Sequence, residues 1–281
     1  ALDALTVTGT TVGENLDAWE RSERRRRFRE ILREQDGIDA NDVVMEPERA
    51  RQEGLTSTVC FPIGNLTPEG SVIKSTAISP EVIDDDGVYR KIGPARVFHS
   101  EVEAIEAVKG QTDNPVKAGD VMVMCGRGPM GTGMEEVAQI TLALKYLSWG
   151  KDVALVTDAR FSGVSTGACI GHVGPEALAG GPIGKLRDGD LVRIVIDGPN
   201  LKGSLDFVGK NGREVSPEEG AEILEAREPA EGLRADPRLP DDTRLWAALQ
   251  NAGGGIWGGC VYDVDAIVTT LEAGQEALSI E

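Results

Sequence analysis

Ser162 lies just beyond the end of an apolar run, in a stretch rich in glycine and small hydroxyl residues. Residues 153–157 are predicted to form a buried strand and residues 159–174 a glycine-rich loop. A serine must be activated before it can act as a nucleophile or a base. The hydrolase pattern G-x-S-x-G is not matched, because Arg160 stands where its first glycine is required. A Ser-His-Asp hydrolase is therefore the weaker interpretation of this serine.

The polar neighbours of Ser162 also have structural interpretations. His172 lies ten residues beyond the serine, where it could line a pocket, although a hydrogen-bonding structural role is the more common one for such a histidine. Asp158 and Arg160 flank the end of the strand. We predict that they form an ion pair that braces the loop.

A second junction between strand and loop follows the apolar residues 119–125. Gly128, Gly131 and Gly133 are the candidate anion-binding glycines at this junction. Their backbone amides, beside the start of a predicted helix over residues 134–149, could bind a carboxylate or phosphate, although a tight turn explains them equally well. The stretch has neither the ending of a P-loop nor the spacing of a dinucleotide fingerprint.

Glu135 and Glu136 are expected in the first turn of this helix. Carboxylates are favoured there by the helix dipole, whatever their function. Carboxylate oxygens are also the ligands that a hard divalent cation prefers. One of the two glutamates is therefore a candidate metal ligand.

The surrounding sequence predicts the elements that must position these residues. A helix is expected over residues 14–35, turn-linked strands over 58–78, and a strand followed by a helix capped by Ser100 over 95–110. Residues 189–197 and 202–209 alternate as an antiparallel pair would. Helices are expected from residue 216 onward.

Composition excludes several classes of function. The formal net charge of −18 disfavours nucleic acid and anionic lipid as partners, and the arginines of residues 21–30 suit one solvated helix face. The four cysteines show no zinc or disulfide spacing, and no apolar run is long enough to span a membrane. A cytoplasmic location is the default. The first residue is Ala1, and the sequence that follows resembles the interior of a longer protein.

Several blocks together resemble a known family. TDARFSGVSTG (157–167), GHVGPEA (171–177) and GGPI (180–183) resemble the dihydroxyacid dehydratase and phosphogluconate dehydratase pattern T-D-G-R-F-S-G-x-[ST]-x-G, G-H-V-x-P-E-A and G-G-P-I. Further blocks follow in the family's order, so that the resemblance covers about residues 5–210. GRGPMGTGMEE and the C-terminal sequence are more similar to the sugar-acid branch, typified by bacterial D-xylonate dehydratases.

The resemblance implies a hydro-lyase that converts a 2,3-dihydroxy acid into a 2-keto-3-deoxy acid with an iron–sulfur cluster and Mg²⁺. Ser162 matches the family's serine base, which takes the C2 proton. Glu136 matches the glutamate that binds magnesium, with Glu135 as the alternative. The residues that would bind substrate are Ser165, Arg160, Gly163 and His172, and the glycine loop of Gly128, Gly131 and Gly133 would bind an anion. A serine hydroxyl ionises near neutral pH only beside a strong positive charge.

The family's three cluster cysteines and its other magnesium ligands lie in an N-terminal half that is not found in this sequence. No cysteine here matches a cluster ligand. We therefore expect a C-terminal half that is colourless, free of iron and inactive when purified alone. Its partners would be the N-terminal half of the same enzyme, further copies in a dimer or tetramer, and a small sugar-acid substrate such as D-xylonate.

The expected fold is mixed α/β, with a β-barrel flanked by helices, similar to the swivelling domain of aconitase-type enzymes. Residues 1–48 would form a helical segment at the junction with the N-terminal half, 49–215 the barrel with the serine, and 216–281 a helical extension packed on the barrel. Two alternatives remain. One is the dihydroxyacid dehydratase of branched-chain amino-acid synthesis, and the other is a non-catalytic anion-binding barrel.

Overall fold

The computed structural model describes residues 1–55, 57–210, 212–253 and 262–279. The chain divides into two compact units, Ala1–Thr56 and Ser57–Glu281. Cys260, one of the four cysteines, lies outside the described residues.

The first unit consists of short helices. Its elements are α1 (Val12–Glu20), α2 (Glu23–Asp36), α3 (Ala40–Val43) and α4 (Pro47–Gln52). The single helix predicted over residues 14–35 is wrong, because the chain is interrupted at Arg21 and Ser22. The Ser22 side chain accepts a hydrogen bond from the amide of Arg25 and so starts a new helix. No residue within these four helices is buried.

The second unit is built on one nine-stranded sheet with the order β1-β2-β6-β5-β4-β3-β7-β8-β9. The strands are β1 (Val59–Cys60), β2 (Gly70–Lys74), β3 (Val88–Phe98), β4 (Val121–Met124), β5 (Ala154–Thr157), β6 (Ala168–Gly174), β7 (Asp190–Asp197), β8 (Lys202–Lys210) and β9 (Arg213–Glu214). The strands β3, β4, β5 and β6 run parallel to their neighbours in this group, whereas β7 and β8 form the predicted antiparallel pair.

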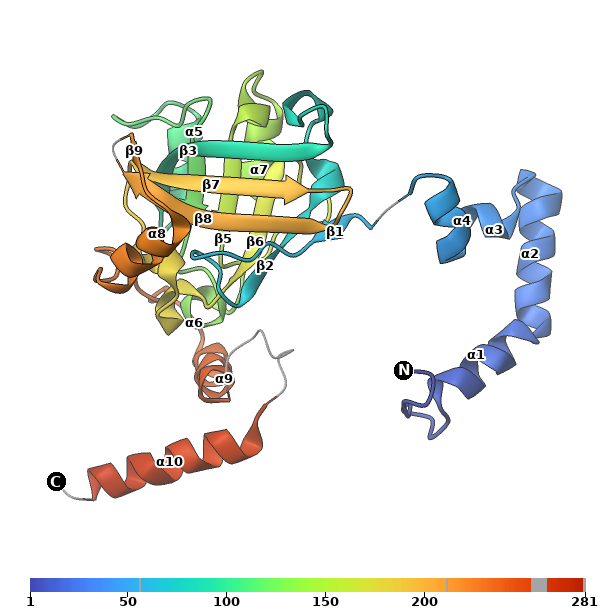
Figure 1. Ribbon diagram of the computed structural model, residues 1–281. Coiled ribbons are helices and arrows are strands. Elements are labelled where there is room, and N and C mark those ends of the chain that lie inside the picture. The colour runs from blue at the N-terminus through green and yellow to red at the C-terminus, as the bar shows by residue number, and fades with distance from the viewer. Residues whose placement is uncertain (56, 211, 254–261, 280–281) are drawn as a thin grey trace. The chain divides into compact units, whose positions relative to one another are not determined.

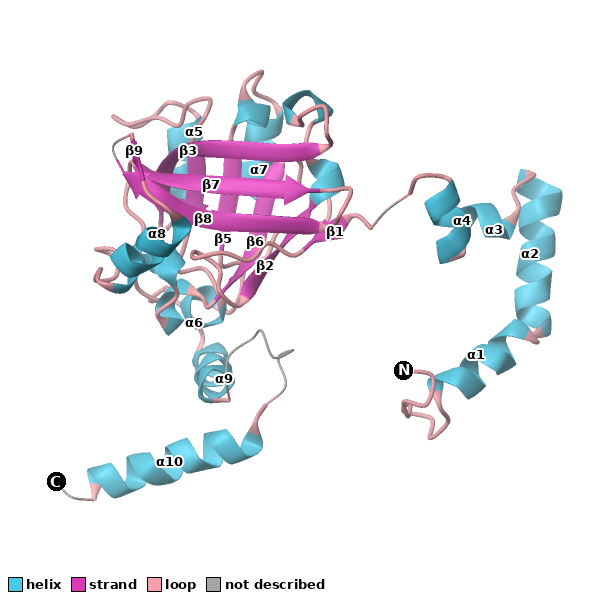
Figure 2. Cartoon of the chain, in the orientation of Figure 1, coloured by secondary structure: helices cyan, strands magenta, loops and turns pink. Residues whose placement is uncertain are grey.

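The long strand β3 makes the sheet curl. Its first part, Val88 to Pro94, pairs with β7, and its last part, Ala95 to Phe98, pairs with β4. Figure 2 shows the result: β3, β7 and β8 cross over β5, β6 and β2 as a second layer. The segment after β1 also reaches β8, because the amide of Leu66 donates to the carbonyl of Leu205 at 3.3 Å. The sheet is therefore a curled half-barrel.

Two apolar cores explain this arrangement. One fills the inside of the curl with large side chains such as Phe207, Ile194 and Ile170. The other lies where α5 and α7 cover the outside of β4 and β5, around Met122, Leu155 and Ile140. Both faces of β4 and β5 are covered, so their residues are all buried, and all of them are apolar except Thr157 at the end of β5. On β7, buried and half-buried residues alternate.

The helices of the second unit are α5 (Glu101–Val108), α6 (Pro129–Thr132), α7 (Ala138–Lys145), α8 (Pro217–Glu225), α9 (Asp241–Ala252) and α10 (Val264–Leu278) (Figure 1). Short 3₁₀ helices lie at Ser75–Ala77, Pro80–Val82, Gly150–Asp152, Ala177–Ala179 and Pro182–Lys185. Ser100 is the N-cap of α5, as predicted, but its side chain makes no capping hydrogen bond. In the part of the chain that the structure describes, no helix has both the length and the apolar character needed to span a membrane.

Two predicted boundaries are wrong. The helix expected over residues 134–149 is shorter, because α7 begins at Ala138, so Glu135 and Glu136 precede it rather than forming its first turn. Residues 168–174 are not loop but strand β6, which pairs with β5 on one side and β2 on the other.

Candidate functional site

The candidate site lies at the edge of the sheet where β4 and β5 end. The two strands are parallel neighbours, so the loops that follow them meet at the same edge. The loop after β4 carries the glycines of residues 126–133, and the loop after β5 carries Ser162. The fold therefore brings the glycine loop and the loop with Ser162 together.

Asp158, the first residue after β5, fastens these loops to each other. Its carboxylate is fully buried and accepts hydrogen bonds from the amides of Gly126 at 3.0 Å, Arg127 at 3.0 Å and Ala177 at 2.9 Å. Burial raises the pKa of Asp158 above its ordinary value, while the three amide donors act in the opposite direction. The side chain is thus an internal clamp.

The predicted ion pair between Asp158 and Arg160 is wrong. No such pair occurs among the residues described, because the amide donors occupy Asp158 and the Arg160 guanidinium turns away from it. The Nε atom of Arg160 donates instead to the carbonyl of Met134 at 2.8 Å. Arg160 is exposed and holds the chain that leads to the two glutamates.

Glu176 is a second buried carboxylate beside the glycine loop. Both of its oxygens lie 3.1 Å from the amide of Met130. Burial raises the pKa of Glu176 to about 7, and the nearby charge of Asp158 raises it as well. This side chain is therefore a carboxyl group that changes charge near neutral pH.

The glycine loop owes its composition to close packing. A Cβ atom on Gly131 would lie 1.9 Å from the carbonyl oxygen of Gly126, and one on Gly128 would lie 2.4 Å from a carboxylate oxygen of Glu176. Gly133 has a φ of +71°, which glycine adopts most readily. The amide of Gly131 donates to the carbonyl of Gly128, the N-cap residue of α6, and the amide of Gly133 donates to the carbonyl of Pro129. The structure thus gives these amides internal partners, and an external anion at Gly128, Gly131 and Gly133 stays a prediction.

The two glutamates differ in their surroundings. Glu135 is half-buried and accepts a hydrogen bond from the Nε atom of Arg127 at 2.6 Å. Glu136 is exposed, and its carboxylate has no ion pair or hydrogen bond with any described residue. Of the two, Glu136 has the carboxylate that is free to bind a cation.

Backbone pairing places Glu136 beside the serine loop. Glu136 and Arg160 form a parallel β-bridge, in which the amide of Arg160 donates to the carbonyl of Glu135 and the amide of Val137 donates to the carbonyl of Arg160. Ser162 follows Arg160 by two residues. The candidate base and the candidate metal ligand therefore lie on adjoining segments.

The serine loop itself is held by its backbone. The amide of Ser165 donates to the Ser162 carbonyl at 2.9 Å, and the Lys74 ammonium donates to the Gly163 carbonyl at 3.0 Å. Ser162 is half-buried, and its Oγ atom accepts a long bond of 3.3 Å from the amide of Val164. A Cβ atom on Gly163 would meet nothing within 4 Å. Open space therefore adjoins the serine.

The other two predicted substrate ligands are less accessible. Ser165 is 5% exposed, and its Oγ atom accepts a hydrogen bond from the hydroxyl of Thr141 at 3.2 Å. His172 is half-buried in β6 with a φ of +54°, and its ring contacts Phe161 edge-on. Burial lowers the pKa of His172, and the Arg160 charge lowers it further. Both effects favour the neutral form of the imidazole.

The described residues provide little for a metal centre. They contain no group of three or more His, Cys, Asp or Glu side chains placed to bind an ion. Cys60, Cys125 and Cys169 are buried free thiols, and burial raises the pKa of Cys125 and brings that of Cys169 to about 12. Thiols that are buried and not grouped with other possible ligands do not fit an iron–sulfur cluster. Glu136 fits a magnesium ion as a single oxygen ligand.

A polar cavity of about 520 Å³ flanks the glycine loop on the side of β3. It is lined by His99, Ser100, Glu103, Arg127, Gly232 and residues 234–238. Sequence reasoning missed Arg127 and Glu176 as organising side chains, and it assigned Asp158 to bracing the loop but with the wrong partner. The position of Asp158 directly after a buried strand was a usable signal, whereas nothing in the sequence marked Glu176 as buried.

Comparison with known proteins identifies relatives of the chain. A family model described as "Dihydroxy-acid/6-phosphogluconate dehydratase C-terminal" matches residues 43–230. D-xylonate dehydratase YagF of Escherichia coli (strain K12) is 60% identical over 279 residues, which are 99% of this chain and 42% of the relative. D-xylonate dehydratase YjhG of the same organism is 58% identical over 271 residues, 96% of this chain and 41% of the relative.

A more distant relative carries a different name. The dihydroxy-acid dehydratase of Caldanaerobacter subterraneus is 42% identical over 196 residues, which are 69% of this chain and 30% of the relative. The chain thus spans less than half the length of each of these relatives.

Proposed function

Because the chain belongs to the dihydroxy-acid/6-phosphogluconate dehydratase family, we propose that it is the proton-abstracting part of a hydro-lyase that acts on a sugar acid. The chain spans only 42% of the D-xylonate dehydratase YagF, so the proposed activity is that of a longer enzyme to which this chain contributes. The single observation that carries it is the β-bridge between Glu136 and Arg160, which puts a free carboxylate beside the segment of Ser162.

Ser162 would remove the proton from C2 of a 2,3-dihydroxy acid. The electron pair of the C2–H bond becomes the C2–C3 double bond, and the 3-hydroxyl group leaves as water once it has been protonated. The resulting enol rearranges to the 2-keto-3-deoxy acid. The open space at Gly163 and the weak hydrogen bond to the Ser162 hydroxyl support this role, because the base must reach carbon without a competing strong partner.

A magnesium ion, when bound, supplies the positive charge that lowers the pKa of a nearby hydroxyl group. Glu136 would be one of its ligands, and the paired Glu135 is the weaker choice. Arg160 lies on the same edge, where its positive charge would attract the substrate carboxylate, and the neutral His172 would donate or accept a hydrogen bond.

We further propose that the other ligands belong to an N-terminal half of the enzyme, together with an iron–sulfur cluster. Residues 1–48 would connect to that half, 49–215 would carry the serine, and 216–281 would form the helical extension. The complete enzyme would be a cytoplasmic homo-oligomer. A likeness of the half-barrel to the swivelling domain of aconitase-type enzymes is part of the same proposal.

D-xylonate or a similar aldonate is the proposed substrate. This choice rests on the two D-xylonate dehydratases, which are 60% and 58% identical to the chain, against 42% for the dihydroxy-acid dehydratase. The second candidate, a branched-chain dihydroxy acid, retains support from that relative and from the shared family.

The experiment uses the full-length enzyme with D-xylonate and with 2,3-dihydroxyisovalerate. We expect turnover of D-xylonate, and deuterium at C2 should slow it if Ser162 breaks that bond. Ser162→Ala should abolish turnover while the absorption spectrum of the cluster is unchanged, whereas Ser204→Ala on β8 serves as a control with full activity. Turnover of only the branched-chain acid would refute the sugar-acid assignment, and an active Ser162→Ala enzyme would refute the base.

A further inference from the structure

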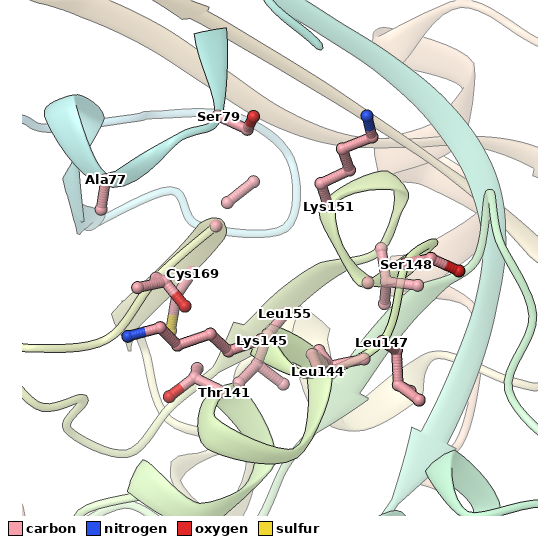
Figure 3. A pocket seen from close by; sticks show the side chains of 15 residues that line it. Ala77, Ser79, Thr141, Leu144, Lys145, Leu147, Ser148, Lys151, Leu155 and Cys169 are labelled. Carbon is pink, nitrogen blue, oxygen red and sulfur yellow. The ribbon is translucent and has the colours of Figure 1, made fainter. Parts of the chain in front are cut away.

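A cavity separate from the candidate site lies between α7 and the segment that leads from Ser162 into β6. Its volume is about 250 Å³, the space of about eight water molecules in the liquid. Neither Ser162 nor Glu136 lines it. Figure 3 shows the side chains of Thr141, Lys145 and Cys169 gathered at one end, with Ser79 and Lys151 at the other.

The charge around this cavity is opposite to that of the whole chain. Lys145 and Lys151 line it, and none of the residues that form its wall is acidic, although the chain has 47 acidic residues and a net charge of −18. Lys151 is paired with Glu81. Lys145 has no ion pair or hydrogen bond with any residue that the structure describes. The cavity therefore offers one uncompensated ammonium group.

The remaining wall combines hydroxyl groups with an apolar base. Ser79, Ser148 and Thr166 provide hydroxyl groups, and Leu144 and Leu155 provide the apolar surface. A ligand that carries several hydroxyl groups and one carboxylate complements this set. The ammonium group pairs with the ligand's carboxylate, and the hydroxyl groups of the wall form hydrogen bonds with those of the ligand. Lys145 is exposed, so water solvates its ammonium group before a ligand binds, and an uncharged ligand gains no attraction from this charge.

The wall is directly connected to the serine loop. Thr141, which lines the cavity, donates a hydrogen bond to Ser165, and the amide of Ser165 donates to the carbonyl of Ser162. Gly167, another wall residue, holds the C-terminal end of the serine loop, because its amide donates to the carbonyl of Ala77 at 2.8 Å. A ligand that contacts Thr141 and Gly167 together would restrict the loop between them.

We propose that this cavity is a second site, which binds a small hydroxylated carboxylate of about five or six carbons and thereby orders the Ser162 loop. It would let an aldonate stabilise the loop without occupying the position next to the base. The inference concerns binding alone, so that it stands or falls independently of the proposed dehydration.

The test is an NMR titration of the ¹⁵N-labelled 281-residue chain with sodium D-gluconate, with sodium chloride at equal ionic strength and xylitol as the uncharged counterpart. We expect saturable shifts at the amides of Thr141, Ser148 and Gly167 with gluconate only. Lys145→Ala should weaken binding about fivefold and Lys145→Arg should restore it, whereas Lys109→Ala on the exposed end of α5 should have no effect. Ser162→Ala should bind as the unaltered chain does.

Hydrogen exchange tests the connection to the serine. Saturating gluconate should slow exchange of the Ser165 amide several-fold. Equal shifts with xylitol, equal binding by Lys145→Ala, or shifts confined to Ser162 and Glu136 would each overturn the second site. Binding at the cavity without slower exchange at Ser165 would overturn the ordering of the loop.

Discussion

The carboxylate of Asp158 accepts a hydrogen bond from the amide of Gly126 at 3.0 Å, and this contact joins the end of β5 to the start of the glycine loop. The same carboxylate holds Arg127 and Ala177. Three chain segments thus depend on one buried side chain, and the position of Glu136 relative to Ser162 depends on those segments.

Replacing this carboxylate should destabilise the fold. Asp158→Asn presents an NH₂ group to donors that need an acceptor, so at least one buried amide loses its partner. We expect the free energy of unfolding to fall by about 2–3 kcal/mol in urea denaturation. Amide exchange should accelerate at Gly126, Arg127 and Ala177. The exposed Asp113→Asn is the control, and equal stability of the two variants would contradict the clamp.

Replacement by alanine should destabilise the chain strongly at Gly131 and hardly at all at Gly163. Gly131→Ala places a Cβ atom 1.9 Å from the Gly126 carbonyl oxygen, so the melting temperature should drop and the free energy of unfolding should fall by more than about 3 kcal/mol. Gly163→Ala meets no atom within 4 Å and should change stability by less than about 1 kcal/mol. In the full-length enzyme the same Gly163→Ala substitution should lower turnover. A stable Gly131→Ala chain would show that the loop can rearrange.

The strands at this edge could be predicted from the sequence because a strand buried on both faces is a run of apolar residues. Residues 121–124 and 154–156 are apolar without interruption, which is typical of strands covered on both faces. The antiparallel pair β7 and β8 was also predictable. Buried and half-buried residues alternate along β7, as they do in a strand with one face in the core. Local pattern and final environment agree in these elements.

The site's details depend on contacts between distant residues, which no local pattern encodes. Glu135 and Glu136 suit a helix start, but pairing with Arg160 holds them in an extended segment and delays α7 to Ala138. Residues 168–174 look like loop because of their glycines, yet pairing with β5 and β2 makes them a strand. The expected Asp158–Arg160 ion pair does not form for the same reason, because backbone amides from other segments donate hydrogen bonds to the Asp158 carboxylate.

The two glutamates should separate stability from metal-dependent activity. Glu135→Gln removes the partner of the half-buried Arg127 and should cost about 1 kcal/mol of unfolding free energy in the 281-residue chain. Glu136→Gln removes an exposed carboxylate without a described partner and should leave stability within about 0.5 kcal/mol. In the full-length enzyme only Glu136→Gln should lose most of its turnover and require more Mg²⁺. The reverse pattern would assign the metal ligand to Glu135.

Glu176 should make stability fall as the pH rises toward neutrality. Its pKa is about 7 in the folded chain, against 4.5 for an unperturbed glutamate, so between these values the folded state holds a proton that the unfolded state has released. Stability from this proton is fully present below about pH 4.5 and is lost as the pH rises through 7. The effect is about 3 kcal/mol over the whole range.

Glu176→Gln keeps a neutral group at every pH. The difference in unfolding free energy between this variant and the unaltered chain should therefore increase by that amount, in favour of the variant, between pH 4.5 and 7.5. Urea denaturation at several pH values measures this difference, with the exposed Glu106→Gln as a control. A difference that does not change with pH would mean that Glu176 is already ionised at pH 5.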